Sequence, residues 1–109
     1  MKKITSNNNS LIKKIKILQK KSSQRKKSKS FIVEGYKEIE KAVKNKYKIE
    51  SLFTSKKSFL LDSNKKNSLS KYLKDCFIVN PDLFKKICYR SNDNNIIAII
   101  KAKEHTINN

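Results

Sequence analysis

The stretch of sequence that decides the fold is Arg25-Lys26-Lys27-Ser28-Lys29-Ser30-Phe31-Ile32-Val33-Glu34-Gly35, in which a basic, fully polar segment gives way to an apolar run. Three apolar residues in succession, two of them β-branched, predict a strand that is buried on both faces. Gly35 ends this strand. A helix is expected over residues 36–46, because apolar residues recur at three- and four-residue intervals at Tyr36, Ile39, Val43 and Tyr47. The stretch therefore predicts a strand, a turn and a helix.

Upstream of this unit, residues 10–21 predict a short amphipathic helix. Leu11, Ile15 and Leu18 lie at helical spacing, and lysines occupy other parts of the surface. Ser10 or one of the asparagines at 7–9 is expected to cap the helix, because a short oxygen-bearing side chain can accept from a free amide of the first turn. Residues 22–30 contain no apolar side chain and are expected to form a flexible, solvated loop.

Downstream, three more strands are expected at residues 49–54, 77–79 and 96–100. A weak helix is marked by Leu69, Tyr72 and Leu73. The start of another helix is predicted by Asn80-Pro81-Asp82, which supplies an N-cap, a proline where no amide is needed and an acid facing the helix dipole. The buried stripe of that helix is expected to be Leu83, Phe84, Ile87 and Cys88.

Strands that alternate with helices imply parallel crossovers and a central sheet covered on both faces. The expected fold class is α/β, a small three-layer α/β/α sandwich preceded by a basic helix. We divide the chain into residues 1–30, the basic N-terminal helix and flexible loop; residues 31–103, the α/β/α domain; and residues 104–109, a polar tail.

Charge is polarised along the chain. The first thirty residues carry eleven basic side chains and no acidic one, so they supply +11 of the formal net charge of +18. Heavy use of Lys, Asn and Ile is also typical of an A/T-rich coding sequence, which makes lysine abundance alone weak evidence. The lack of acids in this segment favours a phosphate backbone as partner, with an anionic membrane surface or simple solvation as alternatives.

Several classes of function find no support in the sequence. With two cysteines and one histidine, a four-ligand Cys/His zinc site cannot be built, and Cys76 and Cys88 are expected to be reduced core thiols. The single glycine excludes a glycine-rich phosphate loop, and no catalytic constellation is visible. No apolar run approaches the roughly 18 residues that span a bilayer, and we expect a cytoplasmic protein.

The sequence resembles the N-terminal substrate-binding domain of the SpoU (TrmH-type) RNA 2′-O-ribose methyltransferases of the SPOUT superfamily. In that family a basic loop with an arginine runs into a Phe-led strand that ends in Glu-Gly, matched here by Arg25, Phe31, Glu34 and Gly35. Segments 4–6, 9–13, 52–54 and 96–101 agree in order and spacing. The chain departs from the family at Asn9-Ser10, where many members have Asn-Pro, and at Asp93-Asn94-Asn95, where many have a Pro-Gln-Gly turn.

The resemblance implies an RNA-binding, substrate-recognition domain of a methyltransferase that acts on rRNA or tRNA and uses S-adenosylmethionine. Family members continue into a knotted domain that binds this cofactor, holds the catalytic residues and forms the dimer. Because the sequence ends at Asn109, we expect this polypeptide to be monomeric and inactive alone, with no cofactor or metal. The alternative is a stand-alone structural RNA-binding protein similar to the ribosomal proteins that bind kinked RNA.

The residues expected to contact RNA are the basic residues of the first helix and the loop after it: Lys13, Lys14, Lys20, Lys21, Arg25, Lys26, Lys27 and Lys29. The four loop residues are all expected to be unburied. Among aromatic residues, Phe31, Phe53, Phe77 and Phe84 are expected in the core, and Tyr89 is the one whose position leaves base stacking open.

Overall fold

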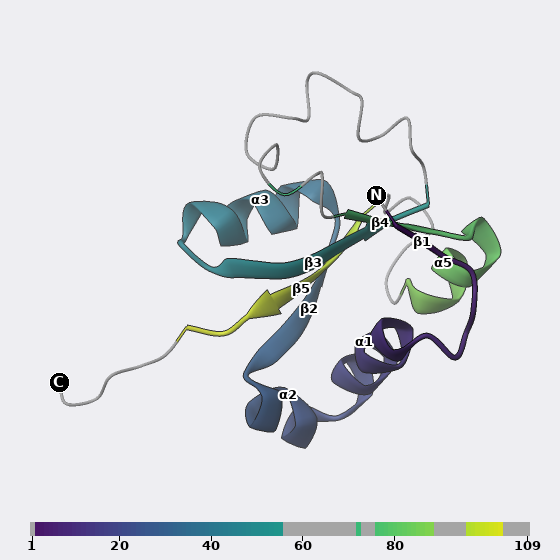
Figure 1. Cartoon of the computed structure of the whole chain (residues 1–109). Coiled ribbons are helices and arrows are strands. Elements are labelled where there is room, and N and C mark those ends of the chain that lie inside the picture. Colours follow the sequence, from purple (N-terminus) through teal and green to yellow (C-terminus); the bar gives the residue numbers. More distant parts are fainter. Residues whose placement is uncertain (1, 56–71, 73–75, 89–95, 104–109) are drawn as a thin grey trace, which may run out of the picture.

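A computed structural model of the chain describes residues 2–55, 72, 76–88 and 96–103. Within these residues it contains five strands and four helices, shown in Figure 1. In chain order they are β1 (Lys2–Ile4), α1 (Ser10–Lys20), α2 (Ser22–Ser28), β2 (Ser30–Glu34), α3 (Tyr36–Lys44), β3 (Lys48–Thr54), β4 (Cys76–Val79), α5 (Pro81–Ile87) and β5 (Ile97–Lys101). The expected weak helix at 69–73 and the loop with Tyr89 lie outside the described residues, Tyr72 excepted.

The five strands form one mixed sheet in the order β1-β4-β3-β5-β2. The pairs β1–β4 and β3–β4 are parallel, whereas β5 runs antiparallel to both of its neighbours, β3 and β2. The α/β class is therefore confirmed, but the expectation of parallel strands throughout was wrong for β5. Whether a strand is parallel or antiparallel to its neighbour depends on the path of the connection that leads to it. Hydrophobic periodicity indicates which residues are buried, but it gives no information about that path.

The apolar run of the decisive stretch is a strand, but it is not fully buried. β2 lies at one edge of the sheet, and Phe31, Ile32 and Val33 are each half-buried. The fully buried strand is β5, in which the four residues from Ile97 to Ile100 are all at most 1% exposed. Both β2 and β5 have a continuous apolar run in the sequence. Only the order of the strands in the sheet decides that β5 is central and fully buried, whereas β2 is at the edge and half-buried.

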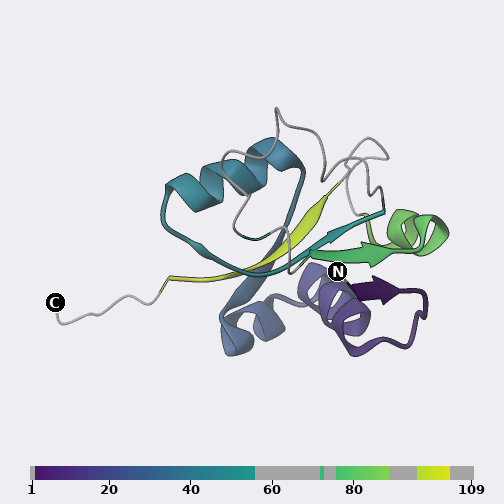
Figure 2. The same ribbon diagram turned by 45° about the horizontal axis from the view of Figure 1, so that its top comes forward.

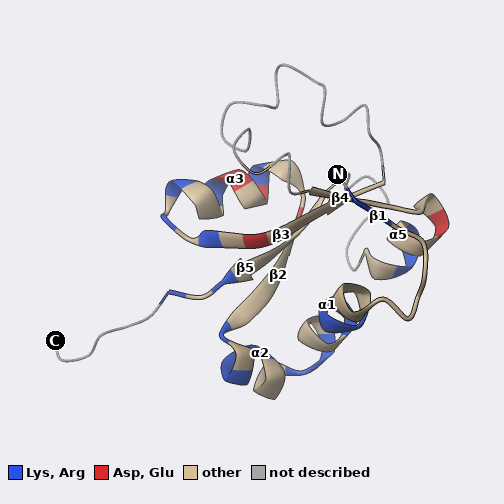
Figure 3. Cartoon of the chain, viewed as in Figure 1, with Lys and Arg blue, Asp and Glu red and all other residues tan. Residues whose placement is uncertain are grey.

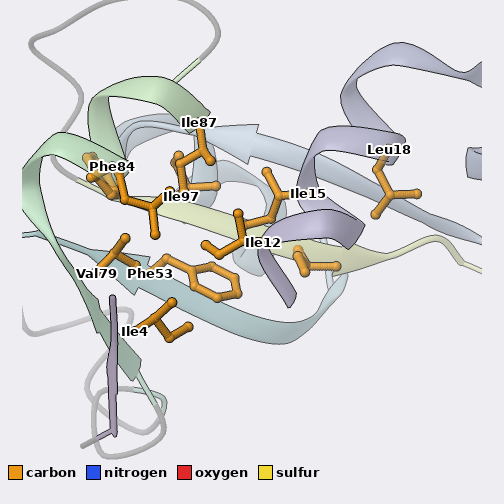
Figure 4. Close-up of a cluster of buried hydrophobic side chains, with 11 residues drawn as sticks. Ile4, Ile12, Ile15, Leu18, Phe53, Val79, Phe84, Ile87 and Ile97 are labelled. Carbon is orange, nitrogen blue, oxygen red and sulfur yellow. The ribbon is translucent and has the colours of Figure 1, made fainter. Parts of the chain in front are cut away.

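Helices cover both faces of the sheet (Figures 1 and 2). On one face, α1 and α5 pack around Phe53 and Ile97, and Figure 4 shows Ile12 and Ile15 of α1 directed into this cluster. On the other face, Ile39 of α3 packs with core residues that include Leu52, Ala98 and Ile100. This gives the predicted three-layer arrangement, with β1 and α1 built into the same sheet and core as the rest.

Two helix starts follow the predicted chemistry. Oδ1 of Asn80 accepts hydrogen bonds from the backbone amides of Asp82 and Leu83, at 2.9 and 3.4 Å, and Pro81 is the first helical residue of α5. In α1, Asn9 is the cap, because its Oδ1 accepts from the amide of Leu11 at 2.8 Å. The buried stripe of α1 is Ile12, Ile15 and Leu18, and Leu11 is half-buried beside it.

The segment expected to be a flexible loop is mostly helical. Residues Ser22–Ser28 form α2, and none of them is buried. Gln, Arg and Lys are good helix formers, and Ser28 Oγ donates to the carbonyl of Gln24 at 2.7 Å. The prediction of a loop was wrong because it relied on the lack of apolar periodicity, whereas this helix is fixed by a polar contact to α1 described below.

Gly35 joins β2 to α3 with a positive φ of 96° and a ψ of 141°. Its amide donates to the carbonyl of Ile96 at 2.9 Å, and its carbonyl accepts from the amide of Ile39 at 3.1 Å. The residue thus ties the end of the edge strand to both the start of β5 and the first turn of α3. A side chain at Cβ is strongly disfavoured in this backbone conformation, which accounts for the only glycine in the chain.

Both cysteines are free, with Cys76 buried and Cys88 half-buried. Burial raises the pKa of the Cys76 thiol to about 12. Burial, followed by the repulsion of the Glu34 carboxylate, raises the pKa of Cys88 to about 11. These values agree with the predicted role as reduced core thiols. No helix in the described part of the chain is long and apolar enough to cross a membrane.

Replacing Gly35 by Ala should lower the free energy of unfolding by about 1–3 kcal/mol, because Ala must adopt the same strained backbone angles. Urea denaturation followed by circular dichroism measures this difference. Lys37→Ala, two residues away on the exposed surface of α3, is the matched control and should change stability by less than about 0.5 kcal/mol. Equal stabilities of the two variants would contradict the role of Gly35.

The two thiols should resist modification at pH 8. A pKa of about 12 in place of 9.0 lowers the thiolate fraction of Cys76 by about a thousandfold at this pH. The absorbance change with a disulfide reagent should therefore be slow in buffer and fast in 6 M guanidinium chloride. The raised pKa values also mean that the folded state holds these protons more tightly, so this contribution to stability should decline as pH rises above 9. Rapid labelling of the folded protein would contradict the raised pKa values of the two thiols.

Candidate nucleic-acid interface

Helix α1 turns its apolar stripe to the sheet and its lysines outward. Lys13, Lys20 and Lys21, the residue that follows the helix, are exposed as predicted. Lys14 is half-buried instead, with its Nζ 3.4 Å from Oε2 of Glu50. The other carboxylate oxygen of Glu50 accepts a 2.6 Å hydrogen bond from Ser30 Oγ. Lys14 therefore helps to hold β3, β2 and α1 together and is the least available of the four.

Helix α2 is held against α1 by Arg25. Its Nη1 donates to the carbonyl of Leu18, in the last turn of α1, at 2.6 Å. Arg25 is half-buried, so the expectation that none of the four loop residues is buried was wrong for this one. A guanidinium group can satisfy a helix carbonyl and still keep donors free, because it has five N–H groups. Lys26, Lys27 and Lys29 are exposed as predicted.

The exposed basic residues of the two helices form one surface, visible along the lower helices in Figure 3. A shallow groove of about 270 Å³ between the helices includes Lys13 and Lys14 from α1 and Gln24 and Ser28 from α2. We call this surface the α1–α2 basic face and define it by Lys13, Lys20, Lys21, Arg25, Lys26, Lys27 and Lys29. The eight residues that the sequence indicated thus lie on two adjoining helices or directly after one of them, and Lys14 is the member whose ammonium group pairs with a carboxylate among the described residues.

Three of the four family-motif residues line a single cavity of about 400 Å³ beside the edge strand β2. Arg25, Phe31 and Glu34 meet there with Leu18, Gln19, Ile32, Val33 and Glu38. The fourth, Gly35, shapes the turn that follows. Glu34 is only 6% exposed, and its carboxylate is close enough to Cys88 to raise the pKa of that thiol. Arg25 belongs to both this cavity and the α1–α2 basic face.

Sequence reasoning missed a second group of basic residues. Lys46, Lys48, Lys101 and Lys103, with Ala102, line a cavity of about 600 Å³ where β3 begins and β5 ends. We call these four residues the lysine cluster. Two lysines two apart at the start of one strand and two at the end of another were visible in the sequence, but only the pairing of β3 with β5 places them together. Among the described residues, no group of acidic residues, His or Cys could hold a metal ion.

The family model of the MRM3-like substrate binding domain matches residues 9–98. The chain belongs to this family. The predicted relationship to the substrate-binding domain of SpoU-type enzymes is thereby confirmed, and it extends from the start of α1 to the middle of β5. No curated protein matches the sequence.

Solved structures similar to this MRM3-like domain are enzymes with a longer chain. The rRNA methyltransferase from Sinorhizobium meliloti superposes with a TM-score of 0.71 at 22% identity over 95% of this chain. The SpoU methyltransferase AviRb from Streptomyces viridochromogenes, solved with AdoMet, gives 0.71 at 16% identity over 93%. An RNA 2′-O ribose methyltransferase gives 0.69 at 24% identity over 96%. The MRM3-like domain spans 38–39% of the length of these structures, and at these identities the likeness shows the fold.

Arg25→Ala should destabilise the MRM3-like domain by about 1–2 kcal/mol, because it removes the hydrogen bond that joins α2 to α1. Urea denaturation measures the loss, and hydrogen exchange should be faster at the amides of α2. Lys26→Ala is the matched control, being the adjacent residue on the exposed side of the same helix, and should change stability by less than about 0.5 kcal/mol. If both variants behave alike, Arg25 does not hold α2 in place.

Proposed function

We propose that this domain binds structured RNA, an rRNA or a tRNA, as the substrate-recognition domain of a SpoU-type RNA 2′-O-ribose methyltransferase. One observation carries the proposal. The basic residues of α1 and α2 lie on one surface, and at Arg25 this surface adjoins the cavity that gathers the family-motif residues. Lysine ammonium groups that have no carboxylate partner within the described ranges suit the sugar-phosphate backbone, because each phosphate contact releases condensed counterions.

The helical form of α2 supports this reading further. Lys26 and Lys27 project from a formed helix that is anchored to α1, so fewer degrees of freedom are lost on binding than in a free loop. Affinity then depends chiefly on charge, and recognition of the target depends on the shape of the RNA against the two helices. We place the protein in the cytoplasm, where free cysteines stay reduced.

Methyl transfer itself is assigned to the part of such an enzyme that corresponds to the remaining length of the solved relatives. AviRb and the rRNA methyltransferase from Sinorhizobium meliloti have both been solved with AdoMet bound, and this chain spans 38% of each. S-Adenosylmethionine supplies an electrophilic methyl group on a sulfonium cation. The lysine cluster does not fit this cofactor, because four ammonium groups repel a cation. The residues described here hold and orient the RNA substrate.

Binding of the full chain to fluorescently labelled tRNA and to a labelled rRNA stem-loop should weaken steeply with salt. With about six phosphates contacted, the association constant should fall roughly 1,000-fold between 50 and 200 mM NaCl. Fluorescence anisotropy measures the slope of log K against log salt concentration. An affinity that does not change with salt, or no binding to either RNA at 50 mM NaCl, would contradict the proposal.

A triple variant locates the binding surface. Lys26→Gln, Lys27→Gln and Lys29→Asn remove three charges from the α1–α2 basic face, and Asn suits the left-handed conformation of residue 29, whose φ is 56°. In this variant the slope of log K against log salt concentration should be shallower than in the wild type by about two units. The control variant carries Lys3→Gln, Lys37→Gln and Lys41→Gln on β1 and α3, away from this face, and has the same net charge. Equal slopes for the two variants would rule out the α1–α2 basic face as the contact surface.

A further inference from the structure

The lysine cluster is held in place by the pairing of β3 with β5. Lys48 lies directly opposite Lys101 in this antiparallel ladder, and Ser30 is opposite Lys101 on its other side. Side chains of directly opposed residues project from the same face of a sheet, so the side chains of Lys48 and Lys101 leave the sheet next to each other. Like charges in this position destabilise the sheet. The protein therefore tolerates repulsion at this point.

No ion pair among the described residues neutralises the cluster. The two ion pairs found there join Lys14 to Glu50 and Lys41 to Glu38, and both lie outside it. Glu50 follows Lys48 by two residues, but it is the extra residue at an irregularity of β3, and its carboxylate binds Ser30 and Lys14. Among the residues that the structure describes, no carboxylate therefore forms an ion pair with any of the four lysines of the cluster.

Local contacts hold the side chain of Lys103 and the backbone of Lys46. Lys103 Nζ lies 4.6 Å from the centroid of the Tyr47 ring, which in turn packs edge-on against Phe31 with the centroids 5.6 Å apart. Lys46 has a positive φ of 68° and closes α3 by donating its amide to the carbonyl of Val43. Asn would be less strained at this position and is common elsewhere in the chain, for example at residues 7–9.

The cluster is continuous with the α1–α2 basic face. The amide of Ala102, within the lining of the cluster's cavity, donates to the carbonyl of Lys29 at 2.7 Å. Lys29 ends α2 in the left-handed conformation. In Figure 3 the basic segments of α2, the end of β5 and the start of β3 follow one another around this end of the sheet. A polyanion that binds along α2 and extends past Lys29 would therefore reach the lysine cluster.

We propose that the lysine cluster is a second phosphate-binding site, which holds the sugar-phosphate backbone of the same RNA that binds the α1–α2 basic face. This inference rests on the proposed function. The site favours a chain of phosphates over a single one, because lysines are point charges on long stems and several of them suit several successive phosphates. Two sites joined through Lys29 and Ala102 would also bind one RNA more tightly than either does alone.

The test uses the full chain with Lys48→Gln, Lys101→Gln and Lys103→Gln, the same labelled RNAs and the control variant at Lys3, Lys37 and Lys41. The cluster variant should lower the salt slope by about two units and weaken binding at 50 mM NaCl at least 10-fold, whereas the control should lose much less. Without RNA, its melting temperature should equal or exceed that of the wild type, because the repulsion between positions 48 and 101 is gone.

The outcomes separate the two proposals. If the wild type does not bind RNA, the proposed function fails. Suppose that the wild type binds RNA and that the variant at Lys26, Lys27 and Lys29 binds it more weakly, as expected. If the cluster variant then has the same RNA affinity and salt slope as the control variant, only the second site is overturned. Binding to phosphatidylserine vesicles that depends on the cluster, with RNA affinity unaffected by it, would also overturn it and point to a membrane surface.

A second measurement requires no variant. Lysines covered by RNA should react more slowly with an acetylating reagent, which mass spectrometry can follow residue by residue. We expect Lys48 and Lys101 to be protected at least threefold by saturating RNA, together with Lys26 and Lys27, while Lys37 stays reactive. Protection of α2 without protection of the cluster would exclude the second site and leave the first in place.

Discussion

The fold depends on the insertion of β5 between β3 and β2. This strand comes last in the described chain, is buried on both faces and hydrogen-bonds to two strands that are far from it in sequence. Because every backbone group of a buried strand needs a partner, its placement fixes the register of both neighbours. Gly35 adds a direct link, since its amide binds the carbonyl of Ile96. The position of β5 also fixes where the residues of the candidate interface lie, because β2 and β3 are placed by their pairing with it.

The positive charge of this domain lowers the stability of its folded state when no anionic partner is bound. It carries a formal net charge of +18, and only two ion pairs occur among the described residues. Self-repulsion of this kind opposes a compact state, and the directly opposed Lys48 and Lys101 add to it locally. Two apolar layers, one around Phe53 and one around Ile39, offset the repulsion. A polyanionic partner would relieve it, so binding and stability are linked.

Several features were predictable because they arise from short-range physics. Asn80-Pro81-Asp82 starts a helix through its own hydrogen bonds and its fixed backbone angle, and α1 and α3 were read from apolar spacing alone. The basic residues at positions 13–29 were likewise found from charge. The helix α2 was missed because its docking depends on Arg25 reaching the carbonyl of Leu18, a polar contact that leaves no periodic pattern. The short strand β1 was missed because its edge position requires β4 as a partner.

The sequence by itself determined the α/β class, the starts of α1, α3 and α5 and the concentration of positive charge near the N-terminus. Each follows from residues close together in the chain. The tertiary structure alone decided that β5 is antiparallel and central, that Arg25, Phe31 and Glu34 share a cavity, and that Lys46 and Lys48 meet Lys101 and Lys103. These facts depend on strand order and register, which are set by long-range pairing that no local pattern of residues encodes.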